Sequence, residues 1–135
     1  MKLSCVTYSS FAAPGLQPDE LEAILRVSQR NNARDGVTGM LMFNGAVFVQ
    51  SIEGPAEAIE RLVMRLGCDN RQCDIVICDE RTLTQRIWPD WSMGYVQLDG
   101  GWLEGQHDIV DALAQPMPRK LHKILTSLAN TLPFA

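Results

Sequence analysis

Hydrophobic and polar residues follow two different periods along this chain of 135 residues. Short apolar runs rich in β-branched and aromatic residues predict five strands, at residues 2–8, 37–43, 46–53, 73–81 and 91–98. Apolar residues three and four positions apart predict two helices, the first from Asp19 until Gly36 and the second from Pro55 until Gly67.

The order of these elements predicts the fold. Asn44-Gly45 lies between the second and third strands and suits a two-residue type I′ turn, because both turn positions need positive φ. The order β-α-β-β-α-β, followed by one extra strand, fits a ferredoxin-like α+β sandwich. In that fold the first and third strands are neighbours.

The predicted strands are apolar on both faces. Met40 alternates with Leu41, and Ile77 alternates with Val76, so neither face can be left to water. Two helices can cover only one face. We therefore expect residues 103–130, or a second copy of the protein, to cover the other face.

The C-terminal segment has the pattern needed for such a cover. Two short amphipathic stretches are predicted, at Ile109–Leu113 and Leu121–Leu128. We expect a main domain at residues 1–98 and a C-terminal helical extension at 99–135, with Gly100-Gly101 as the joint.

Composition narrows the class of protein. The net charge of −4 opposes a role in binding nucleic acid or an anionic membrane surface, which would need clustered Lys and Arg. No apolar run approaches 18 residues and no leader peptide is visible, so we expect a cytoplasmic protein. The four cysteines contain no C-x-x-C pair, which favours reduced thiols over a metal site.

Gln50 is the polar residue that most needs an explanation. Because side chains alternate along a strand, Gln50 lies on the same face as Phe48 and Ile52, and that face should be buried. An unpartnered amide there would cost about 1–3 kcal/mol. Tyr8 could reach Gln50 across the sheet, either as a core pair or as part of a ligand site.

A polar stripe on the first predicted helix indicates a second set of candidates. Leu21, Leu25, Ser28 and Asn32 share one narrow stripe, and Ile24 and Asn31 lie on its edge. The two asparagines could serve as helix caps and loop partners, or they could line a ligand pocket. Arg65, Asp69 and Arg71 on and after the second helix are either solvated charges or a phosphate site.

Together these residues resemble the BLUF family, the blue-light sensors that use a flavin. The resemblance runs from Leu3 to about Leu98 and rests on six ordered blocks. They are Tyr8-Ser9-Ser10, Ser28-Gln29-Arg30-Asn31-Asn32, Gly36-Val37-Thr38-Gly39, Phe48-Val49-Gln50 followed by Glu53-Gly54, Asp69 with Arg71, and Trp91-Ser92-Met93-Gly94.

The resemblance implies a flavin between the two helices, and we expect FAD, with FMN as the alternative. Ile24 and Leu66 would flank the ring, Asn32 would bond its polar edge, and Gln50 would lie beside N5 and O4. The full set of implied contacts is Ile24, Ser28, Asn31, Asn32, Phe48, Gln50, Arg65, Leu66, Asp69 and Arg71.

The resemblance also implies a photochemical role for four residues. Blue light would drive electron and proton transfer from Tyr8, after which the hydrogen bonds around Gln50 rearrange by amide rotation or tautomerisation. Trp91 and Met93, predicted to share one face of their strand, would compete to lie near Gln50 and transmit the change.

We therefore expect a blue-light photoreceptor and not an enzyme, since neither histidine lies near the proposed site. Output would pass through the C-terminal helices, a homo-oligomer or a downstream protein partner. The alternatives are a flavin-free oligomeric interaction module and a small ferredoxin-like enzyme.

Overall fold

The computed structural model describes residues 2–12, 15, 17–43, 46–67, 72–97 and 109–131. In chain order its elements are β1 (Leu3–Ala12), α1 (Pro18–Asp35), β2 (Thr38–Phe43), β3 (Val47–Gly54), α2 (Ala56–Gly67), β4 (Gln72–Leu83), β5 (Gly94–Gln97), α3 (Ile109–Leu113) and α4 (Arg119–Thr131). No helix in these ranges is both long enough and apolar enough to cross a membrane.

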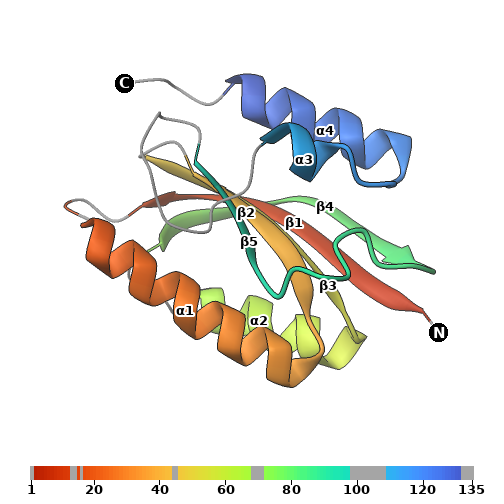
Figure 1. Cartoon of the computed structure of the whole chain (residues 1–135), viewed down its shortest axis with the longest axis horizontal. Helices are drawn as coiled ribbons and strands as arrows, with labels where there is room; N and C mark the ends of the chain where they lie inside the picture. The colour runs from red at the N-terminus through yellow and green to blue at the C-terminus, as the bar shows by residue number, and fades with distance from the viewer. Residues whose placement is uncertain are drawn as a thin grey trace.

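The five strands form one mixed sheet in the order β4-β1-β3-β2-β5. Neighbouring strands are antiparallel except β2 and β5, which are parallel. The predicted ferredoxin-like α+β fold with an extra strand is therefore confirmed, and β1 and β3 are neighbours as expected (Figure 1).

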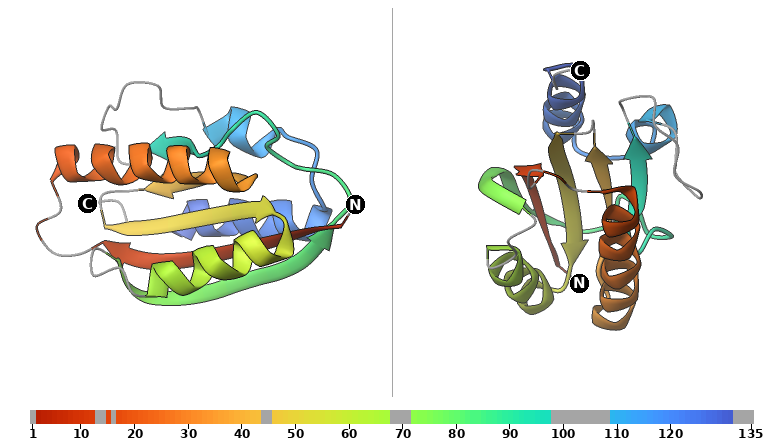
Figure 2. Two further views of the ribbon diagram at one scale, coloured as in Figure 1. Left: turned by 90° about the horizontal axis from the view of Figure 1, so that it is seen from below. Right: turned by 90° about the vertical axis from the view of Figure 1, so that its left-hand side faces the viewer.

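Helices cover both faces of the sheet. Helices α1 and α2 lie on one face, and α3 and α4 lie on the other (Figures 1 and 2). The prediction that the C-terminal segment covers the second face is confirmed. This arrangement explains why the central strands are apolar on both sides.

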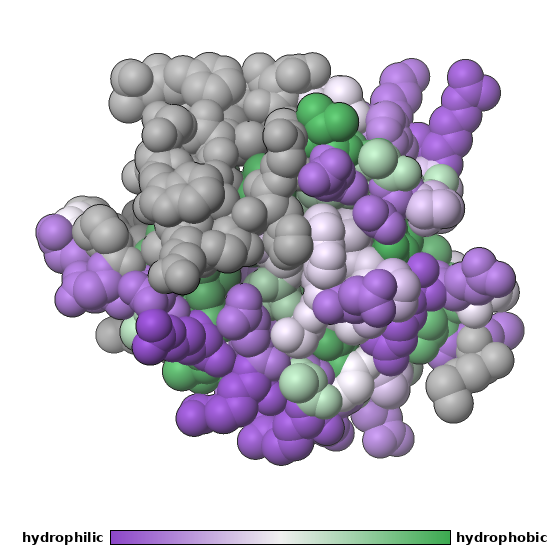
Figure 3. All heavy atoms as spheres, in the orientation of Figure 1, coloured by the Kyte–Doolittle hydropathy of each residue, from purple (hydrophilic) through white to green (hydrophobic). Residues whose placement is uncertain are grey.

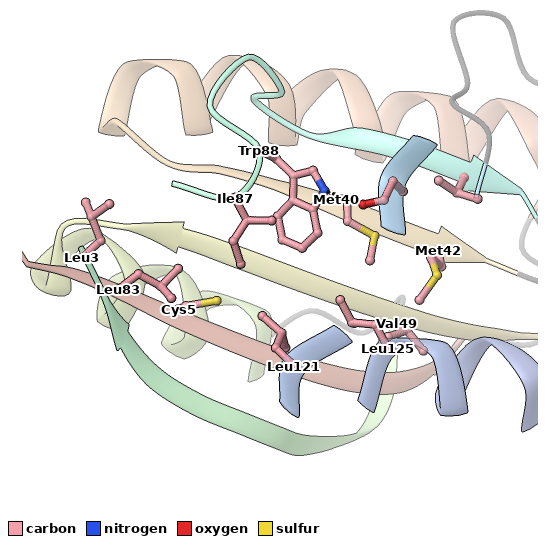
Figure 4. Packing of buried hydrophobic residues seen from close by; sticks show 12 residues of the cluster. Leu3, Cys5, Met40, Met42, Val49, Leu83, Ile87, Trp88, Leu121 and Leu125 are labelled. Atoms are coloured by element: carbon pink, nitrogen blue, oxygen red, sulfur yellow. Dashed lines mark hydrogen bonds between the residues drawn. The ribbon is translucent and has the colours of Figure 1, made fainter. Parts of the chain in front are cut away.

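Two hydrophobic clusters, one on each face, form the core. The cluster under α1 and α2 contains Val6, Leu21, Leu25, Val37, Leu41, Phe43, Phe48, Ile52, Ala58, Ile59, Met93 and Tyr95. The cluster under α3 and α4 contains Leu3, Cys5, Met40, Met42, Val49, Leu83, Ile87, Trp88, Val96, Ala112, Leu121 and Leu125 (Figure 4).

Strand β4 departs from the predicted burial on both faces. Val76 is 56% exposed and Ile77 is 41% exposed, so the helices of this chain leave both faces of the strand uncovered. The physical reason is its position at the edge of the sheet, where the helices cover the central strands first.

Several element boundaries also differ from the sequence pattern. Strand β1 continues beyond its predicted end at residue 8, because Ser9 and Ser10 pair with Val49 and Phe48 of β3. Strand β5 begins only at Gly94. The predicted turn at Asn44-Gly45 and the joint at Gly100-Gly101 lie outside the described residues.

Glu53 fixes the loop between β4 and β5. Its side chain is fully buried, and its carboxylate accepts the backbone N–H of Ile87 at 2.7 Å and of Trp88 at 2.8 Å. The hydroxyl of Thr38 donates to the same carboxylate at 2.7 Å. This one side chain therefore ties β2, β3 and the loop together.

We expect Glu53→Ala to lower the free energy of unfolding by about 3 kcal/mol or more, because it leaves buried backbone N–H groups without an acceptor. Urea denaturation measures the change. Glu60→Ala, at an exposed position of α2, is the matched control and should lie within about 0.5 kcal/mol of wild type. Equal effects of the two substitutions would show that the Glu53 contacts add nothing.

The buried thiol of Cys5 predicts a pH dependence of stability. Burial raises the pKa of Cys5 from 9.0 to about 11. The unfolded thiol loses its proton first, so unfolding releases a proton between pH 9 and pH 11 and the free energy of unfolding falls as pH rises.

Ionisation of Cys5 alone should make the free energy of unfolding about 2 kcal/mol lower at pH 11 than at pH 8. The measurement is urea denaturation of wild type and Cys5→Ala at both pH values. The excess loss should appear only in wild type, and parallel losses in both proteins would contradict the assignment.

Candidate functional site

The register of β1 and β3 places Tyr8 directly opposite Gln50. Both side chains are buried, at 1% and 6% exposure, on the sheet face under α1 and α2. The Tyr8 hydroxyl donates a hydrogen bond to Gln50 Oε1. The predicted reach of Tyr8 across the sheet is confirmed, and the buried amide has the polar partner that it requires.

Met93 is the second partner of Gln50. Gln50 Nε2 donates to Met93 Sδ at 3.3 Å, and the Met93 side chain is 2% exposed. The Gln50 amide therefore lies between a phenol on β1 and a thioether from the segment that precedes β5.

The prediction that Trp91 and Met93 share one face is wrong. Trp91 packs against the cluster under α3 and α4, whereas Met93 belongs to the cluster under α1 and α2. Strict alternation applies only to extended strand, and residues 91–93 precede β5. Gly94 accommodates the Trp91 ring, because a Cβ at that position would lie 2.3 Å from Trp91 Cε3.

Helix α1 holds the segment that carries Met93. Asn32 Nδ2 donates to the Ser92 carbonyl at 2.7 Å, and Gln29 Nε2 donates to the Met93 carbonyl at 3.1 Å. On β2, the backbone N–H of Gly39 donates to the Trp91 carbonyl at 2.9 Å. Asn32 thus forms a hydrogen bond to the loop before β5, which is one of the two roles predicted for it.

Two buried amides at this site retain hydrogen-bonding capacity. Within the described chain, Gln50 Nε2 has the Met93 thioether as its one acceptor, and a thioether is a weak acceptor. Asn32 is 2% exposed, and its Oδ1 accepts no hydrogen bond from the residues described. Both groups can therefore bond to a polar molecule.

Four other predicted contact residues are buried or half-buried. Ile24 and Phe48 are buried, and the Phe48 ring stacks on Phe43 with centroids 4.4 Å apart. Ser28 and Asn31 are half-buried on α1. The face thus combines apolar surface with hydroxyl and amide groups.

Arg65 lies in the last turn of α2 and is exposed. Its guanidinium group lies 3.6 Å from the Asp35 carboxylate of α1. The pKa of Asp35 is lowered, mainly by its hydrogen bond from Arg34, with Arg65 contributing through its charge. Arg65 is therefore a solvent-exposed charge that forms a surface ion pair. The Leu66 side chain, Asp69 and Arg71 lie outside the described part of the structure.

Comparison with known proteins identifies the class to which this fold and site belong. Residues 3–94 of the 135 match the BLUF family, described as sensors of blue-light using FAD. The chain belongs to the BLUF family.

Solved structures agree with this assignment. The chain is similar to the dark-state structure of BlrB, a BLUF protein, with 31% identity and a TM-score of 0.73 over 96% of this chain and 94% of that chain. It is also similar to Klebsiella pneumoniae BlrP1 with FMN and cyclic diGMP, with 26% identity and a TM-score of 0.82 over 96% of this chain and 35% of that chain.

Curated relatives are much longer than this chain. The photoactivated adenylate cyclase subunit beta-like protein FB of Euglena gracilis is 33% identical over 132 residues, which are 97% of this chain and 15% of that protein. The blue light- and temperature-regulated antirepressor BluF of Escherichia coli strain K12 is 32% identical over 79 residues, 57% of this chain and 20% of that protein.

The family membership makes the chain a blue-light photoreceptor with a flavin cofactor. The residues present fit such a group. A flavin ring is flat and apolar on its faces and carries carbonyl and nitrogen groups on its edge. Ile24 and Phe48 supply apolar surface, and the free capacity of Asn32 and Gln50 suits the polar edge.

Sequence reasoning missed three features of the site. Gln29 belongs to one of the sequence motifs, but the motif alone predicts no contact for it. Its three-residue spacing from Asn32 is the signal, because it places both side chains on one face of α1. The Ser92 carbonyl is a backbone partner, which side-chain patterns do not reveal. The role of Glu53 as a loop anchor depends on a contact 34 and 35 residues away.

Asn32 and Gln29 offer a matched pair for testing cofactor contact. Each donates one side-chain hydrogen bond to a backbone carbonyl of the same loop. If Asn32 also bonds the flavin, Asn32→Ala should lower flavin retention about tenfold, a loss of about 1.4 kcal/mol, while Gln29→Ala should retain flavin. Equilibrium dialysis, with the flavin absorption band as the readout, measures retention. Equal loss in both variants would assign the effect to the loop.

Proposed function

We propose that Gln50 is the light-operated switch of this protein. The observation that carries the proposal is its buried amide, which accepts from Tyr8 at one end and donates to Met93 at the other. A carboxamide has an acceptor end and a donor end, so one rotation changes both contacts together.

The flavin would be held between α1 and α2. Support comes from the amide and apolar groups described above, and from the ion pair by which Arg65 of α2 meets Asp35 of α1. The proposed cofactor contacts are Ile24, Ser28, Asn31, Asn32, Phe48, Gln50, Arg65 and Leu66, with Asp69 and Arg71 nearby in sequence. FAD is proposed over FMN, in line with the family description.

The flavin, when bound, supplies the absorption of blue light and accepts an electron and a proton. Tyr8 would supply both, because its hydroxyl is the buried proton donor at Gln50, and would take both back when the radicals recombine, so that the flavin ends oxidised as it began. Gln50 then changes partners, either by rotation or as a tautomer. After rotation Nε2 would face the Tyr8 oxygen and Oε1 would face Met93.

Rotation has a definite consequence for Met93. Its thioether sulfur accepts hydrogen bonds but has no hydrogen to donate, so it cannot bond to an amide oxygen. The Gln50–Met93 hydrogen bond would therefore be lost in the rotated state. Met93, and the segment from Trp91 that carries it, would transmit the change.

The output path would run from this segment to the C-terminal helices. Within the same loop, Trp88 Nε1 donates to the Ala112 carbonyl of α3 at 3.1 Å. We therefore propose a flavin-binding domain at residues 1–98 and an output extension at residues 99–135, with a downstream protein partner.

We further propose that this sensor is a cytoplasmic homo-oligomer. A homo-oligomer is supported by exposed Val76 and Ile77 on the edge strand β4. A cytoplasmic location is supported by the free thiols of Cys5 and Cys78.

Two substitutions test the switch. Wild-type protein should be yellow, and blue light should shift its flavin absorption band reversibly to longer wavelength. Tyr8→Phe removes the proton donor and Gln50→Leu removes the amide, so each should abolish the shift while flavin remains bound. Absorption spectra before and after illumination measure both properties.

Flavin content in each variant is the control for cofactor loss. A normal red shift in both variants would reject the roles assigned to Tyr8 and Gln50. A wild-type protein that takes up no flavin would reject the function itself.

A further inference from the structure

A cleft of about 430 Å³ lies between the loop after β4 and the linker that joins α3 to α4. Ile87 and Met117 contribute apolar surface, Pro89 and Pro116 form part of the walls, and Gln85 and Gln115 add polar groups. Pro89, Pro116 and Gln85 are exposed, so the cleft can be reached from solvent.

The lining of the cleft suits an apolar side chain. Ile87 is 2% exposed and belongs to the cluster under α3 and α4, and Met117 packs partly against the same cluster. Methionine adapts its shape to different apolar partners. A group entering the cleft would therefore extend the existing core.

Positive charge lies immediately beside the cleft. Arg119 and Lys120 follow the lining residue Pro118, begin α4 and are exposed. Neither has an ion pair within the described chain, and α4 contains no acidic residue. In Figure 3 hydrophilic side chains project at the end of the molecule where α4 begins.

Arg119 and Lys120 do not stabilise α4, the helix that carries them. Cations in the first turn oppose the helix dipole, at a cost of about 0.3–1 kcal/mol each. The chain as a whole is acidic, with a net charge of −4. A basic first turn that destabilises its own helix, in a chain that is acidic overall, is a feature expected of a binding surface.

The loop wall of the cleft is linked to the photochemical site. Glu53 binds the backbone of Ile87 and Trp88, and the same loop continues to Met93 at Gln50. The linker wall follows α3, whose Ala112 carbonyl accepts from Trp88. The cleft therefore lies where the two parts of the proposed output path meet.

We propose that this cleft is the docking site of the downstream protein, which inserts one apolar side chain and places Asp or Glu residues against Arg119 and Lys120. The proposal rests on the proposed function, because it names the surface through which that sensor is read. A nucleic acid is disfavoured by the apolar lining and by the overall negative charge.

A short acidic peptide tests the surface directly. The probe is a capped peptide with one phenylalanine flanked on each side by two glutamates, titrated into ¹⁵N-labelled flavin-bound protein. Amide shifts should concentrate at residues 84–88 and 117–120. Replacing every glutamate of the peptide by lysine should abolish binding.

Variants of the protein then separate charge from apolar contact. The double reversal Arg119→Glu/Lys120→Glu should weaken binding about tenfold or more, because two exposed ion pairs are lost. Met117→Ala should weaken it about fivefold. Arg61→Glu, which reverses an exposed charge on α2, is the matched control and should change the dissociation constant less than twofold.

Three results would overturn the docking site. The first is peptide binding that is absent or that the double reversal leaves unchanged. The second is tighter binding of a twelve-nucleotide oligothymidine than of the peptide. The third is self-association of the wild type that the double reversal abolishes. The flavin red shift is recorded on the same samples. Its absence would reject the proposed function independently of the peptide result.

Discussion

The structure depends on the burial of one carboxamide in an apolar sheet face. Gln50 can remain there only because Tyr8 donates to its oxygen and Met93 accepts from its nitrogen. The β1–β3 register fixes the first contact, and the segment before β5 provides the second. A change at this amide therefore reaches two separate parts of the sheet at once.

The two faces of the sheet differ in their side chains. The face under α1 and α2 carries the amides and apolar groups that fit a flavin, and the face under α3 and α4 carries the second core cluster. The loop from 84 to 93 contributes Met93 to one face and Trp88 to the other. Glu53 anchors this loop, so its position is defined by β3 itself.

Much of the site followed from alternation and element order. Those two patterns predict Tyr8 beside Gln50, and helical spacing predicts Ile24 and Asn32 on the inner part of α1; the structure has both. Alternation did not predict that Trp91 and Met93 lie on opposite faces of the sheet. It holds only within an extended strand, and these residues precede β5.

The amino-acid sequence by itself determined the succession of elements, the apolar character of the central strands and the polar positions on α1 and β3, because these depend on local propensity and periodicity. Only the tertiary structure decided that Met93 and not Trp91 meets Gln50, that Glu53 holds a loop more than thirty residues away, and that β4 leaves Val76 and Ile77 in solvent. These outcomes depend on long-range packing and on position within the sheet, which no local pattern encodes.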